Sequence, residues 1–137
     1  MIKNFLESDR LYYEALSKKH VTKTYLDWLR NPIVSKYIET DSSFTMDDLK
    51  NYIKNIEKNS SCAWAIITKL KDKHIGNIKI DPIDFETNEG KYGIMIGDNK
   101  EWGKGYAYEA SERILEYCYK NLNLKNINLG VKKENKN

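Results

Sequence analysis

The fold is most strongly indicated by a glycine-containing loop in the last third of the chain. Residues 97–107 read Gly97-Asp98-Asn99-Lys100-Glu101-Trp102-Gly103-Lys104-Gly105-Tyr106-Ala107. The loop follows an alternating segment and precedes a helical one, so it lies at a helix N-terminus, where unpaired N–H groups and the helix dipole attract anions. Gly103 and Gly105 place no side chain between a ligand and the backbone, and Lys100 and Lys104 add positive charge. The pattern therefore predicts a diphosphate site.

The spacing of this loop excludes two common phosphate-binding motifs. A P-loop needs four residues between its glycines and Ser or Thr after the Lys, whereas five residues separate Gly97 from Gly103 and Gly105 follows Lys104. A dinucleotide-binding fingerprint needs a third glycine, but that position is Tyr108. On the glycines alone, a tight turn that starts a helix and binds nothing is as good an interpretation as an anion site.

The hydropathy pattern around the loop predicts a single α/β domain over residues 1–137, with a mixed sheet. Strand patterns occupy 11–16, 62–68, 75–80 with Pro82 as the stop, 92–96 and 127–131. Helical spacing begins at Val21, restarts at Asn31-Pro32, and recurs over 45–59 and again after the glycine loop.

Two of the predicted helices carry specific signals. Thr45 and Asp48 have the spacing of a capping box, which fixes a helix start. The helix after the glycine loop has an apolar stripe formed by Ala107, Ala110, Ile114, Cys118 and Leu122. Cys62 lies on a predicted buried strand, so we expect both cysteines to be inert packing residues.

The composition excludes several classes of protein. With 137 residues, of which 40% are hydrophobic and 31% charged, the chain has the size of one globular domain that needs no disulfide or metal to hold a core. The net charge is +3, only three of the 23 basic residues are Arg, and the Lys residues are interleaved with acids, which argues against a nucleic-acid partner. No apolar run approaches the ~20 residues of a membrane span, and the N-terminus lacks the apolar segment of a signal peptide. We therefore expect a cytoplasmic protein with no metal, membrane or nucleic-acid partner.

The glycine loop resembles the acetyl-CoA pyrophosphate loop of the GNAT (general N-acetyltransferase) superfamily, whose pattern is Gln/Arg-x-x-Gly-x-Gly/Ala. The corresponding residues here are Lys100-Glu101-Trp102-Gly103-Lys104-Gly105. The longer string 102–110 is similar to the branch that includes the ribosomal-protein N-terminal acetyltransferases, and residues 25–37 resemble members found with amino-sugar biosynthesis. The order of elements matches as well. The resemblance implies an α+β type of α/β fold, in which helices flank a mixed, mostly antiparallel twisted sheet.

The resemblance implies transfer of an acetyl group from acetyl-CoA to a primary amine, by direct attack in a ternary complex. Dispersed lysines favour a small-molecule amine, such as a nucleotide-linked amino sugar, over an acidic peptide. Two alternatives remain open: acetylation of a protein N-terminus, and a non-catalytic module that binds acyl-CoA. A homodimer is compatible with each of them.

The resemblance also implies the residues that bind the cosubstrate. The strand before the loop would pair with the pantetheine amides, and the backbone N–H of Ile96 would polarise the thioester carbonyl. Asn135 would bond the pantetheine arm, and the loop would wrap the diphosphate. The implied cosubstrate-binding residues are Ile94, Met95, Ile96, Lys100, Trp102, Gly103, Lys104, Gly105, Tyr106, Ala107 and Asn135.

The catalytic base is not fixed by the sequence. Many relatives in the branch carry Glu at the position of Lys91. Glu89 is the first candidate base, with Asp81, Asp84 and His74 as alternatives, although His74 fits a polar residue at a strand start better. Apolar spacing favours a core position for Trp28 and Tyr37 over a place in a substrate cleft.

The end of the chain departs from the family pattern. Relatives continue past the position of Asn135 with a helix and two strands, and that helix often carries a Tyr that protonates the departing thiolate. We expect this C-terminal segment to be missing here, which would leave the last strand as an open edge. An incomplete sequence, completion of the fold by another chain, and a truncated product each explain the difference.

Overall fold

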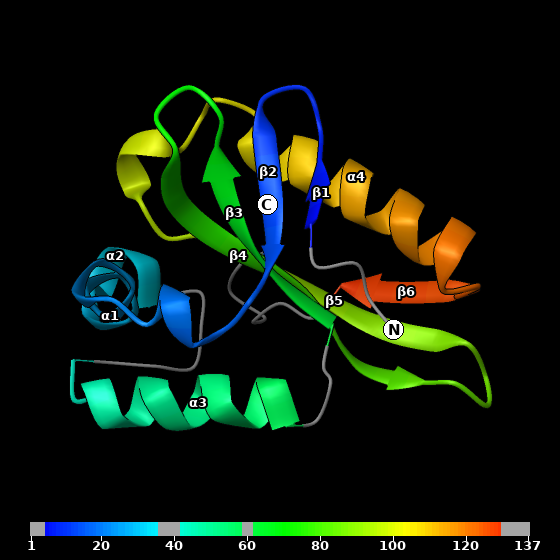
Figure 1. Ribbon diagram of the computed structural model, residues 1–137, viewed down its shortest axis with the longest axis horizontal. Coiled ribbons are helices and arrows are strands. Elements are labelled where there is room, and N and C mark those ends of the chain that lie inside the picture. Colours follow the sequence, from blue (N-terminus) through cyan, green and yellow to red (C-terminus); the bar gives the residue numbers. More distant parts are fainter. Residues whose placement is uncertain (1–4, 36–41, 59–61, 130–137) are drawn as a thin grey trace.

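The computed structural model describes residues 5–35, 42–58 and 62–129, which form one six-stranded sheet with helices on both faces (Figure 1). The sheet order is β1-β2-β3-β4-β5-β6, and neighbouring strands are antiparallel except for the parallel pair β5 and β6. The strands are β1 (Phe5–Glu7), β2 (Leu11–Ala15), β3 (Cys62–Thr68), β4 (Lys73–Asp84), β5 (Glu89–Ile96) and β6 (Asn126–Leu129). The helices are α1 (Lys23–Arg30), α2 (Pro32–Ser35), α3 (Met46–Lys58) and α4 (Tyr106–Asn121), with 3-10 turns η1 (Lys18–His20) and η2 (Asn99–Glu101). The predicted mixed, mostly antiparallel sheet is confirmed.

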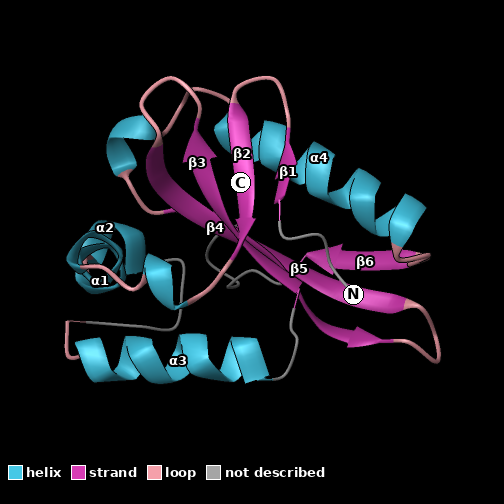
Figure 2. Ribbon diagram, viewed as in Figure 1, coloured by secondary structure: helices cyan, strands magenta, loops and turns pink. Residues whose placement is uncertain are grey.

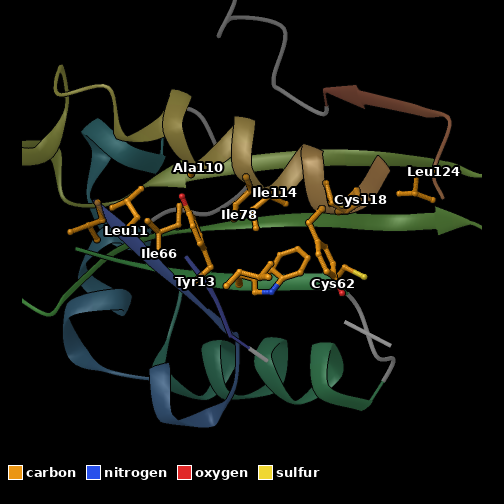
Figure 3. Packing of buried hydrophobic residues seen from close by; sticks show 14 residues of the cluster. Leu11, Tyr13, Cys62, Ile66, Ile78, Ala110, Ile114, Cys118 and Leu124 are labelled. Carbon is orange, nitrogen blue, oxygen red and sulfur yellow. The ribbon is translucent and has the colours of Figure 1, made fainter. Parts of the chain in front are cut away.

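The sheet separates two hydrophobic cores. Helix α4 lies on one face, and α1 to α3 lie on the other (Figure 2). All seven residues of β3 are buried, because this central strand is covered on both faces. Side chains of α4, including Ala110, Ile114 and Cys118, point toward those of Ile66 and Ile78 on the sheet (Figure 3).

The capping box at the start of α3 is confirmed. The backbone N–H of Thr45 donates to Asp48 Oδ2 at 2.8 Å, and the N–H of Asp48 donates to Thr45 Oγ1 at 3.1 Å. These reciprocal bonds satisfy two N–H groups that the helix itself leaves unpaired. The helix then buries Leu49, Ile53 and Ile56 against the sheet.

The predicted stripe on α4 is partly wrong. Ala107 is exposed, whereas Tyr117, which the predicted stripe omits, is buried. Cys62 and Cys118 are both buried, and burial raises the pKa of their thiols to about 11 and about 12. Thiols in this state are protonated near neutral pH, which confirms that they are packing residues.

Two strands differ from the sequence prediction. Strand β1 has only three residues, too few to give an alternating signal, so it was not predicted. Strand β4 does not stop at Pro82 but continues to Asp84. The register shifts between Ile80 and Ile83, and the Asp81–Pro82 peptide bond is cis. A bulge tolerates proline because the residue there donates no ladder hydrogen bond.

No helix among the described residues has both the length and the apolar character that crossing a membrane requires. The two longest, α3 and α4, each carry charged residues along an outer face.

We expect a large stability loss when Ile114 is replaced by Ala. Ile114 is fully buried between α4 and the sheet, so truncation removes apolar burial and leaves a cavity. We expect the free energy of unfolding in urea to fall by about 2–5 kcal/mol. Leu70→Ala is the control, because Leu70 is 89% exposed, and it should change stability by less than about 0.5 kcal/mol. Equal losses in the two variants would contradict the packing described here.

Candidate functional site

Strand β5 changes its hydrogen-bonding partners halfway along its length. It pairs with β4 over most of its length, but β6 pairs only with residues 89–92. Residues 93–96 therefore have no strand partner among the described residues on the side away from β4. The result is a short free edge at the end of β5 that leads into the glycine loop.

The direction of the peptide groups at this edge follows from one hydrogen bond. The N–H of Gly97 donates to the carbonyl of Ile75 at 2.8 Å, so it points toward β4. Successive residues in a strand alternate their peptide groups between its two sides. The N–H and C=O groups of Ile94 and Ile96 therefore point away from β4, into the free edge. An extended ligand could pair with them as an added strand.

The indole of Trp102 confirms this direction. Its Nε1–H donates to the carbonyl of Ile96 at 2.6 Å, which places the Ile96 carbonyl on the free side of β5. The Trp102 side chain is nevertheless 41% exposed. The bond closes the loop between the end of β5 and the glycines.

The glycine loop ends at the N-terminus of α4. Gly105 is the N-cap of α4, with a φ of 81° and no side-chain cap. Gly103 also has a φ of 81°, and a Cβ built on it meets nothing within 4 Å. Glycine adopts this left-handed backbone at no steric cost. The N–H groups of the first turn are thus uncapped and accessible to an anion.

The two lysines of the loop differ in their surroundings. Lys104 Nζ donates to Glu101 Oε1 at 2.6 Å, and the Glu101 side chain is 5% exposed. This hydrogen bond raises the pKa of Lys104 and also offsets its charge. Lys100 lies exposed on η2. Of the two, Lys100 therefore supplies the less compensated charge.

Arg10 lies beside the loop although 93 residues separate it from Lys104 along the chain. Its Nη1 donates to the carbonyl of Lys104 at 2.9 Å, and its Cζ lies 4.5 Å from the centre of the Tyr106 ring. Its Nε donates to Glu109 Oε1 at 2.7 Å. Nothing in the local sequence marks Arg10 as part of this site. The turn between β1 and β2 brings it there.

A cluster of rings supports the opposite side of the β5 end. The Trp28 ring is buried and covers the backbone of Gly97, where an added Cβ would lie 2.1 Å from Trp28 Cδ2. The His74 ring centre lies 4.9 Å from that of Trp28 and 5.7 Å from that of Tyr25. The core position predicted for Trp28 is confirmed, and Gly97 is needed because Trp28 approaches it so closely.

A family model described as an acetyltransferase (GNAT) domain matches residues 10–137. The chain belongs to the GNAT family. It is 29% identical to the N-acetyltransferase p20 of Bacillus licheniformis over 135 residues, which covers 93% of this chain and 75% of that protein. The family match and this named relative together identify the chain as an acetyl-CoA-dependent N-acetyltransferase.

Solved GNAT structures share the fold. The spermidine N-acetyltransferase of Vibrio cholerae, in complex with CoA and spermine, superposes with a TM-score of 0.79 at 24% identity, over 93% of this chain and 75% of that one. The RimL ribosomal L7/L12 α-N-protein acetyltransferase gives 0.80 at 11% identity, over 96% and 73%. At these identities the likeness concerns the fold.

The GNAT fold does not bring all of the predicted site residues together. Ile94, Met95, Ile96 and the loop from Lys100 to Ala107 are contiguous at one end of β5, although the Met95 side chain packs toward α1 and α3, opposite α4. Asn135 and Tyr37 lie outside the described residues. Glu89 begins β5 and Ile96 ends it, so seven steps of about 3.3 Å put about 23 Å between them. The geometry therefore does not support Glu89 as the base.

The other three candidate bases, Asp81, Asp84 and His74, lie in different parts of the fold. Asp84 Oδ1 accepts from the N–H groups of Glu86 and Thr87 in the turn after β4, and Asp81 lies in the bulge of that strand. His74 is at the glycine-loop end, where its Nε2 lies 2.8 Å from Asn77 Oδ1. Burial lowers the pKa of His74. The hydrogen bond to Asn77 raises this pKa, whereas the electrostatic interaction with His20 lowers it further, and the net effect is a lowered pKa. His74 is thus a neutral member of the ring cluster near pH 7.

No group of three or more His, Cys, Asp or Glu residues within the described ranges is arranged to hold a metal ion.

The carboxylate of Glu109 gives a prediction for the pH dependence of stability. Burial by itself raises the pKa of Glu109, but hydrogen bonds from Ser8 and from the backbone and side chain of Arg10 outweigh it and hold the pKa below its usual range. A lowered carboxyl pKa contributes stability above the unfolded-state pKa and loses it as the pH falls through the folded-state pKa.

We therefore expect the wild type to exceed Glu109→Gln in stability at pH 7, and this advantage to decline as the pH falls below about 4.3. Urea unfolding at a series of pH values measures the difference. An advantage that is constant with pH, or that grows in acid, would contradict the assignment of these hydrogen bonds.

Proposed function

We propose that this chain transfers the acetyl group of acetyl-CoA to a primary amine on a small molecule, such as a nucleotide-linked amino sugar. The observation that carries the proposal is the continuity of two features. The free edge of β5 presents the peptide groups of Ile94 and Ile96, and the next segment is an uncapped helix N-terminus behind two left-handed glycines. An extended amide-containing arm attached to a diphosphate has matching chemistry at both places.

The residues at the free edge would hold the reacting end of the cosubstrate. Ile94 and Ile96 would pair with the pantetheine amides, and the N–H of Ile96 would donate to the thioester carbonyl as charge develops on its oxygen. Donors of this kind are worth roughly 3–4 kcal/mol of barrier. An amide N–H of the arm would donate to the Ile96 carbonyl, which also accepts from Trp102 Nε1.

The diphosphate would lie against residues 102–107. The N–H groups of the first turn of α4 would donate to its oxygens, and Lys100 would add charge. Gly103 and Gly105 would allow the ligand to approach the backbone closely: a Cβ on Gly103 would meet nothing within 4 Å, and one on Gly105 would meet only Arg10 Nη2, at 3.5 Å.

Direct attack agrees with the state of the cysteines. In the proposed reaction the amine nitrogen forms a bond to the thioester carbon and the C–S bond breaks. The nitrogen loses one proton and the departing thiolate gains one, so the products are the amide and free CoA thiol. An acyl-enzyme would need an accessible nucleophile. Both cysteines are buried and protonated near neutral pH, so neither offers one.

The distribution of charge supports a small-molecule acceptor. The chain carries 23 basic and 20 acidic residues, and described lysines such as Lys19, Lys23 and Lys69 are paired with acids. The likeness to the spermidine enzyme and to RimL leaves a polyamine and a protein N-terminus as the alternatives.

The function is tested by incubating the chain with acetyl-CoA and a panel of amines, with release of free thiol as the readout. The panel holds a nucleotide-linked amino sugar, spermidine and a peptide with a free N-terminus. Thiol release above the amine-free rate with the sugar supports the proposal. Release with only the polyamine or only the peptide replaces the substrate class, and acetyl-CoA binding without turnover of any amine indicates a binding module.

The glycine loop can be tested with Gly105→Val. The side chain would obstruct the diphosphate and cannot adopt a φ of 81° without strain. We expect acetyl-CoA affinity, measured by calorimetry, to fall at least tenfold, which corresponds to about 1.4 kcal/mol. Asn88→Val is the matched control, because Asn88 has a φ of 59° in the turn between β4 and β5, far from the loop. Similar losses of affinity in both variants would show that strain alone is responsible.

Glu89→Gln tests the distance argument. Since Glu89 lies about 23 Å from Ile96, the variant should keep kcat/KM for acetyl transfer within about twofold of the wild type. A loss of a hundredfold or more would restore Glu89 as the general base, and its dependence on pH would then report the pKa of that carboxyl.

A further inference from the structure

We propose that Arg10 is a positioning residue of the acyl-CoA site: it neutralises Glu109 and fixes the Lys104 carbonyl, so that the N-terminus of α4 can accept the diphosphate. The inference rests on the proposed function and extends it to a residue from the distant turn between β1 and β2 (Figure 1). It addresses a problem created by Glu109, because an anionic side chain lies in the first turn of the helix that is to bind an anion.

Glu109 is firmly held in its charged form. Its Oε2 accepts from Ser8 Oγ at 2.5 Å and from the N–H of Arg10 at 2.8 Å, and its Oε1 accepts from Arg10 Nε at 2.7 Å. The side chain is only 15% exposed, so solvent screens its charge poorly. Without a cation beside it, this carboxylate would oppose the attraction that the helix dipole exerts on a phosphate.

Arg10 makes contacts with three parts of the site at once. Besides Glu109, its guanidinium donates from Nη1 to the carbonyl of Lys104 and lies over the ring of Tyr106. Its Nη2 is 3.5 Å from the position of a Cβ built on Gly105 and makes no hydrogen bond to a described residue. A planar guanidinium can make these contacts together, whereas the ammonium of a lysine cannot.

These contacts also set the shape of the loop. The Lys104 carbonyl lies between Gly103 and Gly105, the two residues with left-handed backbone. A hydrogen bond to that carbonyl orients the peptide that joins Lys104 to Gly105, and so orients the N–H of Gly105 as well. Arg10 therefore acts on the ligand through the loop and through Glu109.

Arg113, on α4, provides a matched control. It also reaches from α4 to the N-terminal hairpin, with Nε donating to the carbonyl of Glu7 at 2.8 Å and Nη1 contacting Glu116. It resembles Arg10 in charge and type of contact, although its side chain is 28% exposed against 43% for Arg10. It lies about one turn beyond Glu109 along α4, further from the glycines.

The experiment compares acetyl-CoA affinity of the wild type, Arg10→Gln, Arg113→Gln and the double variant Arg10→Gln with Glu109→Gln, by calorimetry. We expect Arg10→Gln to lose at least tenfold and Arg113→Gln less than twofold. The double variant should recover at least threefold relative to Arg10→Gln, because it removes the uncompensated carboxylate. The deficit of Arg10→Gln should also shrink between about 0.1 M and about 1 M NaCl as screening increases.

A merely structural role would make the double variant no better than the single one and would leave the deficit unchanged by salt. Either of these results, or equal affinities of the Arg10 and Arg113 variants, overturns the inference while acetyl-CoA binding by the wild type keeps the proposed function. Failure of the folded wild type to bind acetyl-CoA overturns both. If Arg10→Gln does not fold, the double variant is used instead, because it buries no unpaired charge. Acetyl-CoA affinity within about threefold of the wild type then supports the inference. A larger loss of affinity that salt does not reduce overturns it.

Discussion

The candidate site depends on the point at which β5 loses one of its two neighbours. A central strand normally satisfies its peptide groups on both sides, since an unpaired group in a buried place costs free energy. Here β6 accompanies β5 only as far as Tyr92. Ile94 and Ile96 are left with peptide groups that face no strand among the described residues, and Trp102 satisfies one of the carbonyls. The edge therefore presents peptide groups with which an extended ligand could pair.

The two cores make such an edge sustainable. A strand with one free side could twist or slip, but the side chains of β5 are anchored on both faces of the sheet. Ile94 and Ile96 pack toward α4, whereas Met95 packs with the cluster under α1 and α3. Gly76 and Gly97 permit close contact at this end, because a Cβ on Gly76 would lie 2.0 Å from the Met95 carbonyl and one on Gly97 would enter the Trp28 ring. The free edge is thus held in place by packing on both faces of the sheet.

The features that could be predicted from the sequence are those set by residues close together along the chain. The capping box at Thr45 and Asp48, the buried strand at 62–68 and the helix after the glycines are all local patterns, and the structure contains them. The glycine loop was located for the same reason. Arg10 could not be found in this way, because its place beside Lys104 is set by the pairing of β1 with β2 and by their position next to α4. Glu89 illustrates the converse: it is near the loop in sequence, yet an extended strand carries it about 23 Å from Ile96.

The charges around the glycine loop suggest how an anion would be selected. Three acids near the loop each have a cation: Asp98 is 2.5 Å from Lys73, Glu101 is 2.6 Å from Lys104, and Glu109 is paired with Arg10. These pairs cancel most of the local net charge, so a non-specific attraction for polyanions would be weak. What remains for a ligand is the exposed charge of Lys100 and the set of N–H groups at the start of α4, behind the left-handed residues Gly103 and Gly105. In the proposed complex, recognition would therefore depend on how a phosphate fits against the backbone as well as on its charge, which favours a compact diphosphate on an extended arm over a uniform polyanion.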